Sequence, residues 1–179
     1  MSDFKISLPD TLFATAECAS YSGGLPLPSF TQGGIEFRFP NPLSWQVTIT
    51  NTSEAFLVMG SISGKGSCDC VRCLEDAPVE VEGEVEGYFV LPGHEPDEED
   101  EDAPDFETLP DDHVIDLEPL LLTAVSLSLP FNPVCKEDCL GLCSQCGANL
   151  NEGPCSCDKE EDVDEGNPFA VLKNLKFDQ

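Results

Sequence analysis

The sequence predicts an α+β fold made of a mainly antiparallel β-sheet or partial barrel, one helix after an acidic loop, and a small cysteine-rich tail. Three observations predict it. Apolar and polar side chains alternate in several short runs before residue 91, an acidic stretch without Lys or Arg follows, and six of the ten cysteines gather between residues 135 and 157. Alternation with a period of two is typical of strands that bury one face and expose the other.

The clearest strand covers residues 79–91. Its apolar side chains point one way and its glutamates the other: Val79, Val81, Val85, Phe89 and Leu91 against Glu80, Glu82, Glu84 and Glu86. Gly83 and Gly87 interrupt the buried side, which predicts bulges at these two positions. Further strands are expected at 35–39, 45–49 and 56–62, separated by turn-forming residues.

A long Pro-, Asp- and Glu-rich loop is expected at 92–112, followed by a helix at 116–128 with Asp116 as its cap. Five apolar residues recur at helical spacing and predict a face that packs on the core: Leu117, Leu120, Leu121, Ala124 and Val125. These elements form a β-rich domain, 1–133. A cysteine-rich metal-binding tail, 134–179, ends in a short helix that starts after Asn167-Pro168.

The net charge of −27 is concentrated in residues 95–118 and 158–165. Such runs form solvated linkers or attract basic partners. The eight Lys and Arg residues form no stripe, which argues against tight direct binding to a phosphate backbone. No apolar run approaches the roughly 18 residues of a membrane span, and no basic-then-apolar leader opens the chain. We therefore expect a cytoplasmic protein without membrane contact, in which close cysteines bind metal instead of forming disulfides.

The cysteine-rich segment contains the motif Cys143-x2-Cys146-Gly147 and a second pair, Cys155-x-Cys157. Two intervening residues let a tight turn aim two thiolates at one ion, and the glycine permits the backbone conformation that the turn needs. These four cysteines are the predicted ligands of a structural Zn2+, while Cys135 and Cys139 could substitute for one pair or extend the site. Soft thiolates also suit an iron–sulfur cluster, and free or redox-active thiols are the third interpretation.

A second motif, Cys70-x-Arg72-Cys73, lies between two predicted strands. It is interpreted as a hairpin turn with buried thiols and a positioning arginine, which makes these residues a candidate functional motif. Two alternatives stay open, namely a thiol whose pKa Arg72 lowers for nucleophilic attack, and a contribution to a metal site. Because no base, nucleophile and orienting group form a set, with His94 and His113 interpreted as solvated loop residues, no enzymatic activity is expected.

Several short motifs in a fixed order resemble the YceD family of bacterial large-subunit ribosomal RNA accumulation proteins over roughly residues 33 to 177. They are Cys70-x-Arg72-Cys73-Leu74, Asp116-Leu117, Leu127-Ser128-Leu129-Pro130, the run from Cys139 to Asn151, Cys155-Ser156-Cys157, and Asn167-Pro168-Phe169-Ala170-Val171-Leu172. The resemblance implies a non-enzymatic role in accumulation and processing of 23S ribosomal RNA and in biogenesis of the large ribosomal subunit.

Together with the acidic charge, this resemblance leads us to expect basic ribosomal or assembly proteins and large-subunit precursor particles as partners, with weak or indirect RNA contact. The alternative, which follows from the cysteine content, is a thiol-based redox or metal-handling protein.

Overall fold

A computed structural model describes residues 4–94 and 106–157, and these residues divide into two compact units between Cys139 and Leu140. In the first unit the elements follow the order β1 (Lys5–Ser7), η1 (Asp10–Phe13), β2 (Cys18–Leu25), β3 (Ser29–Gln32), β4 (Ile35–Arg38), β5 (Leu43–Asn51), β6 (Ala55–Asp69), β7 (Asp76–Val90), β8 (Glu107–Thr108), β9 (Val114–Asp116) and α1 (Glu118–Ser128). The fold class predicted for this unit is confirmed. No described helix is long and apolar enough to cross a membrane.

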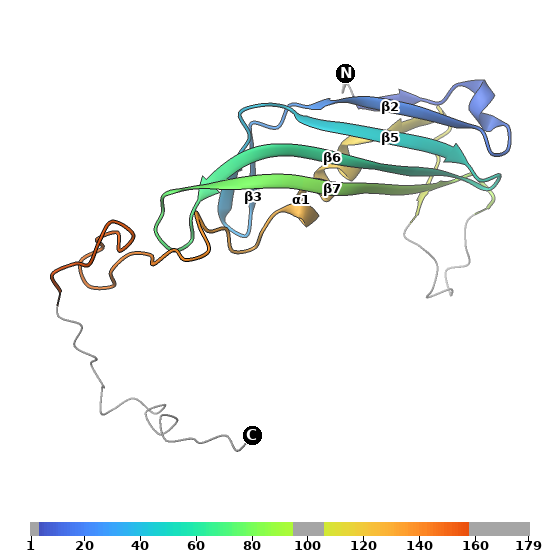
Figure 1. Cartoon of the computed structure of the whole chain (residues 1–179). Helices are drawn as coiled ribbons and strands as arrows, with labels where there is room; N and C mark the ends of the chain where they lie inside the picture. Colours follow the sequence, from blue (N-terminus) through green and yellow to red (C-terminus); the bar gives the residue numbers. More distant parts are fainter. Residues whose placement is uncertain (1–3, 95–105, 158–179) are drawn as a thin grey trace, which may run out of the picture. The chain divides into compact units, whose positions relative to one another are not determined.

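Strands β2, β5, β6 and β7 lie side by side as the main part of one sheet (Figure 1). All of its pairings are antiparallel except β7 with β8, and it does not close into a barrel within the described residues. The β3–β4 hairpin joins β6 through the pair Arg38 and Ser67. Its two-residue turn, Gly33-Gly34, has positive φ at both positions, which matches the right-handed twist of the flanking strands.

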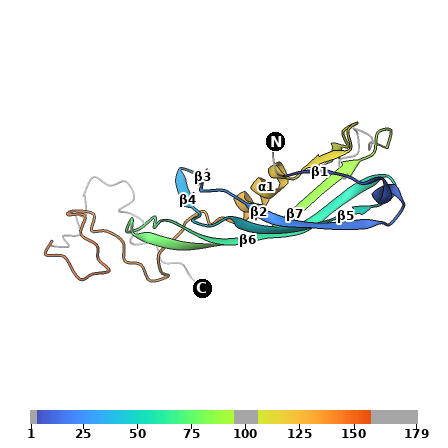
Figure 2. The same ribbon diagram turned by 90° about the horizontal axis from the view of Figure 1, so that it is seen from above.

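Helix α1 and the short β1 strand lie on one face of this sheet (Figure 2). The core forms between that face and the helix, where Leu121, Ala124 and Val125 of α1 are buried. From the sheet, alternate residues of β5, β6 and β7 complete the core: Trp45, Val47, Ile49, Phe56, Val58, Ile62, Val79, Val81 and Val85. The alternation in the sequence therefore identified the buried face of β7 correctly.

Gly83 and Gly87 do not form bulges, which corrects the sequence-based prediction. The register of β6 with β7 is regular from Ala55 opposite Val90 to Asp69 opposite Asp76. A Cβ atom on Gly83 would lie 2.5 Å from the carbonyl oxygen of Ala124. The glycines are needed because the helix approaches the strand closely, and not because the strand pairing is interrupted.

Three other elements refine the prediction. Asp116 is not the helix cap, which corrects the prediction: the helix begins at Glu118, Leu117 occupies the N-cap position, and no side chain caps the helix there. The Asp116 carboxylate still accepts a hydrogen bond of 3.0 Å from the Glu118 backbone N–H. The acidic loop contains β8, which the sequence did not predict, and residues 95–105 of this loop lie outside the described part of the chain. The predicted helix after Asn167-Pro168 also lies outside it.

Candidate metal centres and the acidic sheet face

The second unit places the four predicted zinc ligands together. The sulfur atoms of Cys143, Cys146, Cys155 and Cys157 all lie within 4.8 Å of one another. A single ion about 2.3 Å from each of four sulfurs requires them to be about 3.8 Å apart, which this limit admits. The predicted tail therefore contains four thiols that could hold a metal ion, and we call them the C-terminal group.

Local backbone structure positions the first pair of these thiols. The Gly147 N–H donates to the Cys143 carbonyl at 2.9 Å, and Gly147 has φ of +73°. The glycine thus supplies the left-handed residue that closes the turn, as the sequence predicted. A bridge between Leu142 and Asn149, with the Cys143 N–H donating to the Ala148 carbonyl at 2.8 Å, returns the chain toward the second pair.

Two thiols of this group, Cys143 and Cys157, differ in acidity. Hydrogen bonds from the backbone N–H groups of Cys146 and Gln145 lower the pKa of Cys143 to about 6. A hydrogen bond with Cys146 raises the pKa of the Cys157 thiol to about 12. A divalent cation would remove this difference, because it stabilises all of its thiolate ligands together.

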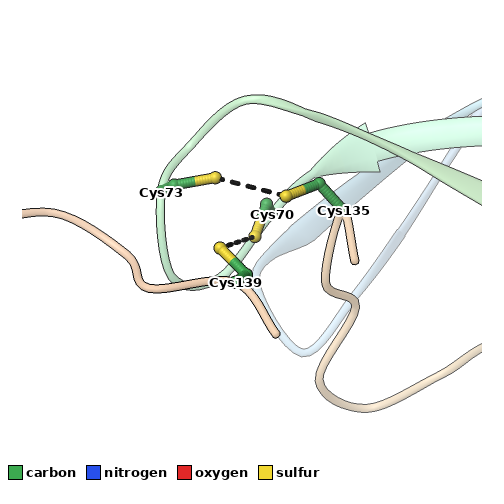
Figure 3. Close-up of side chains that lie close together, drawn as sticks. All are labelled: Cys70, Cys73, Cys135 and Cys139. Atoms are coloured by element: carbon green, nitrogen blue, oxygen red, sulfur yellow. Dashed lines mark hydrogen bonds between the residues drawn. The ribbon is translucent and has the colours of Figure 1, made fainter. Parts of the chain in front are cut away.

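Cys135 and Cys139, the alternates for that site, lie instead with Cys70 and Cys73. These four sulfurs also lie within 4.8 Å of one another, and we call them the hairpin cluster. Figure 3 shows all four pointing toward one another, with Cys70 and Cys73 from the turn between β6 and β7 and the other two from the segment after α1. Three of them are at most 4% exposed, and Cys135 is half-buried.

Arg72, which lies between Cys70 and Cys73 in the turn, connects the two segments of the hairpin cluster. Its guanidinium donates to the carbonyl of Cys139 at 3.0 Å and to that of Glu137 at 3.4 Å. The neighbouring Val71 N–H donates to the Pro133 carbonyl at 3.0 Å. The guanidinium thus links the hairpin turn to the backbone of the segment after α1, and its role as a positioning residue stays a prediction.

The thiols of the hairpin cluster also divide in acidity. Burial raises the pKa of Cys70, but N–H donors from the backbone of Cys135, Arg72 and Cys73 outweigh it and bring the pKa to about 6. A hydrogen bond with Cys73 raises the pKa of Cys135 to about 12. Cys68, the penultimate residue of β6, is buried but belongs to neither group of thiols, and burial raises its pKa.

The sheet face opposite α1 carries a column of exposed glutamates along β7. They are Glu80, Glu82, Glu84 and Glu86. Neighbouring strands present hydroxyl and amide groups in register: Ser61 lies opposite Glu84, Gln46 opposite Ser61, and Ser22 opposite Gln46. Strand β7 is also an edge, since its described pairing beyond β6 is limited to Phe89 and Val90 with β8. We call this column the glutamate face.

Each Lys and Arg side chain in the described residues contacts a carboxylate or a backbone carbonyl. The Arg38 guanidinium lies 2.8 Å from Asp69 and 3.2 Å from Asp76, and these hydrogen bonds raise the pKa of Arg38. The four others are Lys5 with Asp116, Lys65 with Glu80, Lys136 with Asp138, and Arg72 with the carbonyls named above. Within residues 4–94 and 106–157, therefore, no Lys or Arg is left without such a contact.

Fold and site together define a class of protein: an antiparallel sheet backed by one helix, with two groups of four thiols and an acidic face. The comparisons with known proteins identify the family. Residues 58–176 match the family model described as "Large ribosomal RNA subunit accumulation protein YceD", and the chain belongs to this family. The match spans both groups of thiols.

Among relatives, uncharacterized proteins of Mycobacterium tuberculosis and Mycobacterium bovis are each 34% identical over 131 residues, which is 73% of this chain and 59% of theirs. The chain thus spans less than two thirds of the length of these relatives. The chloroplastic YCED homolog 1 of Arabidopsis thaliana, named as a large ribosomal RNA subunit accumulation protein, is 37% identical over 62 residues, 35% of this chain and 18% of its own. No solved structure matches the chain.

Proposed function

We propose that this protein is a non-enzymatic accessory factor in the accumulation and processing of 23S ribosomal RNA, and so in biogenesis of the large ribosomal subunit. Membership in a family described by large ribosomal RNA accumulation supports a role connected with the ribosome. The name of the Arabidopsis relative points in the same direction.

The choice of partner rests on the contacts that the Lys and Arg side chains already make. A protein that neutralises phosphates needs free Lys and Arg side chains, because release of counterions drives such binding. Here every Lys and Arg in the described residues already contacts an acidic group or a carbonyl, and the whole chain carries −27. We infer that bare RNA is bound weakly and that the first contact is with a basic ribosomal or assembly protein.

The glutamate face is the surface we assign to that contact. Its carboxylates lie on one side of an edge strand, and of the four only Glu80 contacts a cation among the described residues. An edge strand exposes backbone hydrogen-bonding groups that an extended segment can use, while charges of opposite sign raise the rate of encounter. The alternative explanation is that these charges only keep the edge strand from aggregating, and it predicts no partner for this surface.

Zinc is our proposal for the metal of the C-terminal group, in a structural role. Four thiolates of a tetrahedral set suit zinc, and a site in which all ligands come from protein leaves no position open for substrate. The same thiols favour one other function, a redox or metal-handling protein. Metal analysis separates them, because firmly held zinc with thiols that react only after chelation argues against redox work.

The test uses purified full-length protein at physiological salt. We expect weak binding to naked 23S RNA and measurable binding to large-subunit precursor particles and to their isolated basic proteins. Nuclease treatment should not abolish the contact with the isolated proteins. Tight binding to naked RNA would overturn the inference about the partner, and failure to bind particles, proteins and RNA alike would overturn the proposed function.

Two charge-reversal variants, one on the glutamate face and one elsewhere, test where the basic protein binds. Glu82→Lys, Glu84→Lys and Glu86→Lys together change the net charge by six units and should weaken binding to basic proteins at least tenfold. The matched control reverses three exposed acids elsewhere in the first unit: Asp10→Lys, Glu17→Lys and Asp111→Lys. Equal loss in both variants would mean that only net charge matters and would refute the assignment of the glutamate face.

A further inference from the structure

We propose that the hairpin cluster, Cys70, Cys73, Cys135 and Cys139, is a second zinc site, separate from the C-terminal group and structural in character. The inference stands independently of the ribosomal role. Cys73 and Cys135 are 62 residues apart in the sequence, and Cys70 and Cys139 are 69 apart. The fold brings these two distant pairs into one group.

The spacing of the sulfur atoms matches one tetrahedral ion. Sγ of Cys70 lies 3.8 Å from Sγ of Cys139, and Sγ of Cys73 lies 3.5 Å from Sγ of Cys135 (Figure 3). Four sulfurs at about 2.3 Å from a central zinc are about 3.8 Å apart along each edge of the tetrahedron. These are two opposite edges, so each of the four thiols belongs to one of them, and the remaining sulfur–sulfur distances are within 4.8 Å.

The backbone of the hairpin turn repeats that of the turn in the C-terminal group. In each, a Cys-x2-Cys pair is followed by a residue with positive φ, +63° at Leu74 and +73° at Gly147. In each, the N–H of that residue donates to the carbonyl of the first cysteine, at 3.0 Å to Cys70 and 2.9 Å to Cys143. Two separate places in the chain thus build the same thiol-presenting turn.

The conformation of Leu74 strengthens this comparison. A bulky residue other than glycine rarely adopts positive φ, because its Cβ crowds the backbone, and such residues persist where the surroundings hold them. The side chain of Leu74 is 67% exposed, so core packing does not explain the conformation. The positive φ of Leu74 is instead explained by closure of the turn that presents Cys70 and Cys73.

The chemistry of the group also suits a closed structural site. The four thiols supply all four positions of a tetrahedral ion, and Cys70, Cys73 and Cys139 are nearly inaccessible. Zinc binding would convert the four thiols to thiolates with release of their protons, leaving two negative charges on the complex. The Arg72 N–H, which donates to Sγ of Cys70 at 3.4 Å, and the adjacent Arg72 guanidinium are placed to balance that charge.

The metal would fasten the tip of the β6–β7 hairpin to the segment that follows α1. Besides the thiols, this junction contains hydrogen bonds of Val71 to Pro133 and of Arg72 to the carbonyls of Glu137 and Cys139. Removal of the ion should therefore loosen the junction while the sheet remains folded.

Zinc content of full-length protein, measured by elemental analysis with matched variants, tests the site. We expect two zinc ions per chain in the unaltered protein, one in Cys73→Ser or Cys135→Ser, and one in Cys143→Ser. The control Cys18→Ser removes an exposed cysteine outside both groups and should leave two. One zinc per chain that survives Cys73→Ser and is lost in Cys143→Ser would overturn the proposal.

A second measurement avoids variants that could fail to fold. Alkylation of the unaltered protein, followed by mass mapping, should label Cys18 at once and the four hairpin thiols only after a chelator is added. Cobalt titration of the metal-free chain should reach two equivalents with tetrahedral thiolate absorption. Labelling of the hairpin thiols that chelation leaves unchanged, a disulfide joining Cys73 to Cys135, or iron in place of zinc would each refute the assignment.

Discussion

Replacing Gly83 by alanine tests why two glycines interrupt the buried side of β7. A Cβ atom at Gly83 would lie 2.5 Å from the carbonyl oxygen and 2.9 Å from the carbonyl carbon of Ala124 in α1. At Gly87 the nearest atom would be Cδ1 of Leu120, at 2.7 Å. Backbone of a packed helix cannot move aside locally, whereas the end of a leucine side chain can rotate away. The two substitutions should therefore differ.

The expected magnitude follows from two opposing effects. Overpacking a core costs about 1–3 kcal/mol. Replacing glycine also reduces the conformational entropy of the unfolded chain, which stabilises the folded state by about 0.4–1 kcal/mol. The net loss for Gly83→Ala should be about 1–2 kcal/mol, which for a chain of this size lowers the melting temperature by roughly 2–8 °C. Gly87→Ala should stay within about 0.5 kcal/mol of the unaltered protein.

Fluorescence of Trp45 is the natural assay, because it is the single tryptophan and is buried in the sheet. Urea unfolding followed at Trp45 reports on the first unit alone. Unfolding of Gly83→Ala at a clearly lower urea concentration, with Gly87→Ala near the unaltered midpoint, supports the close helix contact. If Gly83→Ala were neutral or stabilising, the reasoning about the helix would be refuted.

Three further predictions concern the buried hydrogen bonds and the thiols. Asn51 is 3% exposed, its amide donates to the Leu12 carbonyl at 3.0 Å and its oxygen accepts from the Ser53 N–H at 2.7 Å. Asn51→Ala should therefore cost about 1–3 kcal/mol in the same urea assay. Because a charged hydrogen bond at a partly exposed position contributes about 1 kcal/mol, Arg72→Ala should speed zinc release from the hairpin cluster to a chelator roughly fivefold. Arg72→Lys should not restore the slow rate if the contacts to backbone carbonyls matter, and full restoration by lysine would favour a role for charge alone. Chelation, or acidification that protonates the ligand thiols, should abolish exchange protection of the Cys143 and Gly147 amides without changing Trp45 fluorescence, since metal binding by such segments is coupled to their folding. Retained protection after complete metal removal would contradict this.

Local pattern was enough to predict several elements. The alternation along β7 fixed its buried face, because a period of two in the sequence is also the period of side chains on a strand. The spacing and glycine of Cys143-x2-Cys146-Gly147 predicted the turn that presents two thiols, since every contact involved lies within five residues. The helical spacing around Leu121 predicted the packed face of α1 for the same reason.

Other features depended on which segments meet in space. The sequence indicated two bulges at Gly83 and Gly87, whereas the approach of α1 to β7 is what requires small residues there. The Cys70-x2-Cys73 motif has the same spacing as the C-terminal turn, but it lacks the glycine that made the other one recognisable. Leu74 adopts the left-handed conformation without it. Comparison of the two cysteine spacings was the one local signal that could have revealed the hairpin cluster.

In the cysteine-rich segment, the sequence alone predicted the grouping of the thiols only for the second half. Cys143, Cys146, Cys155 and Cys157 gather because short return loops connect them, so their grouping could be predicted from proximity along the chain. Cys135 and Cys139 lie just as near in sequence, yet the fold joins them to cysteines more than 60 residues earlier. Only tertiary structure decided this, because contacts of long sequence separation depend on how the β6–β7 hairpin and the segment after α1 pack, and no local pattern encodes that packing.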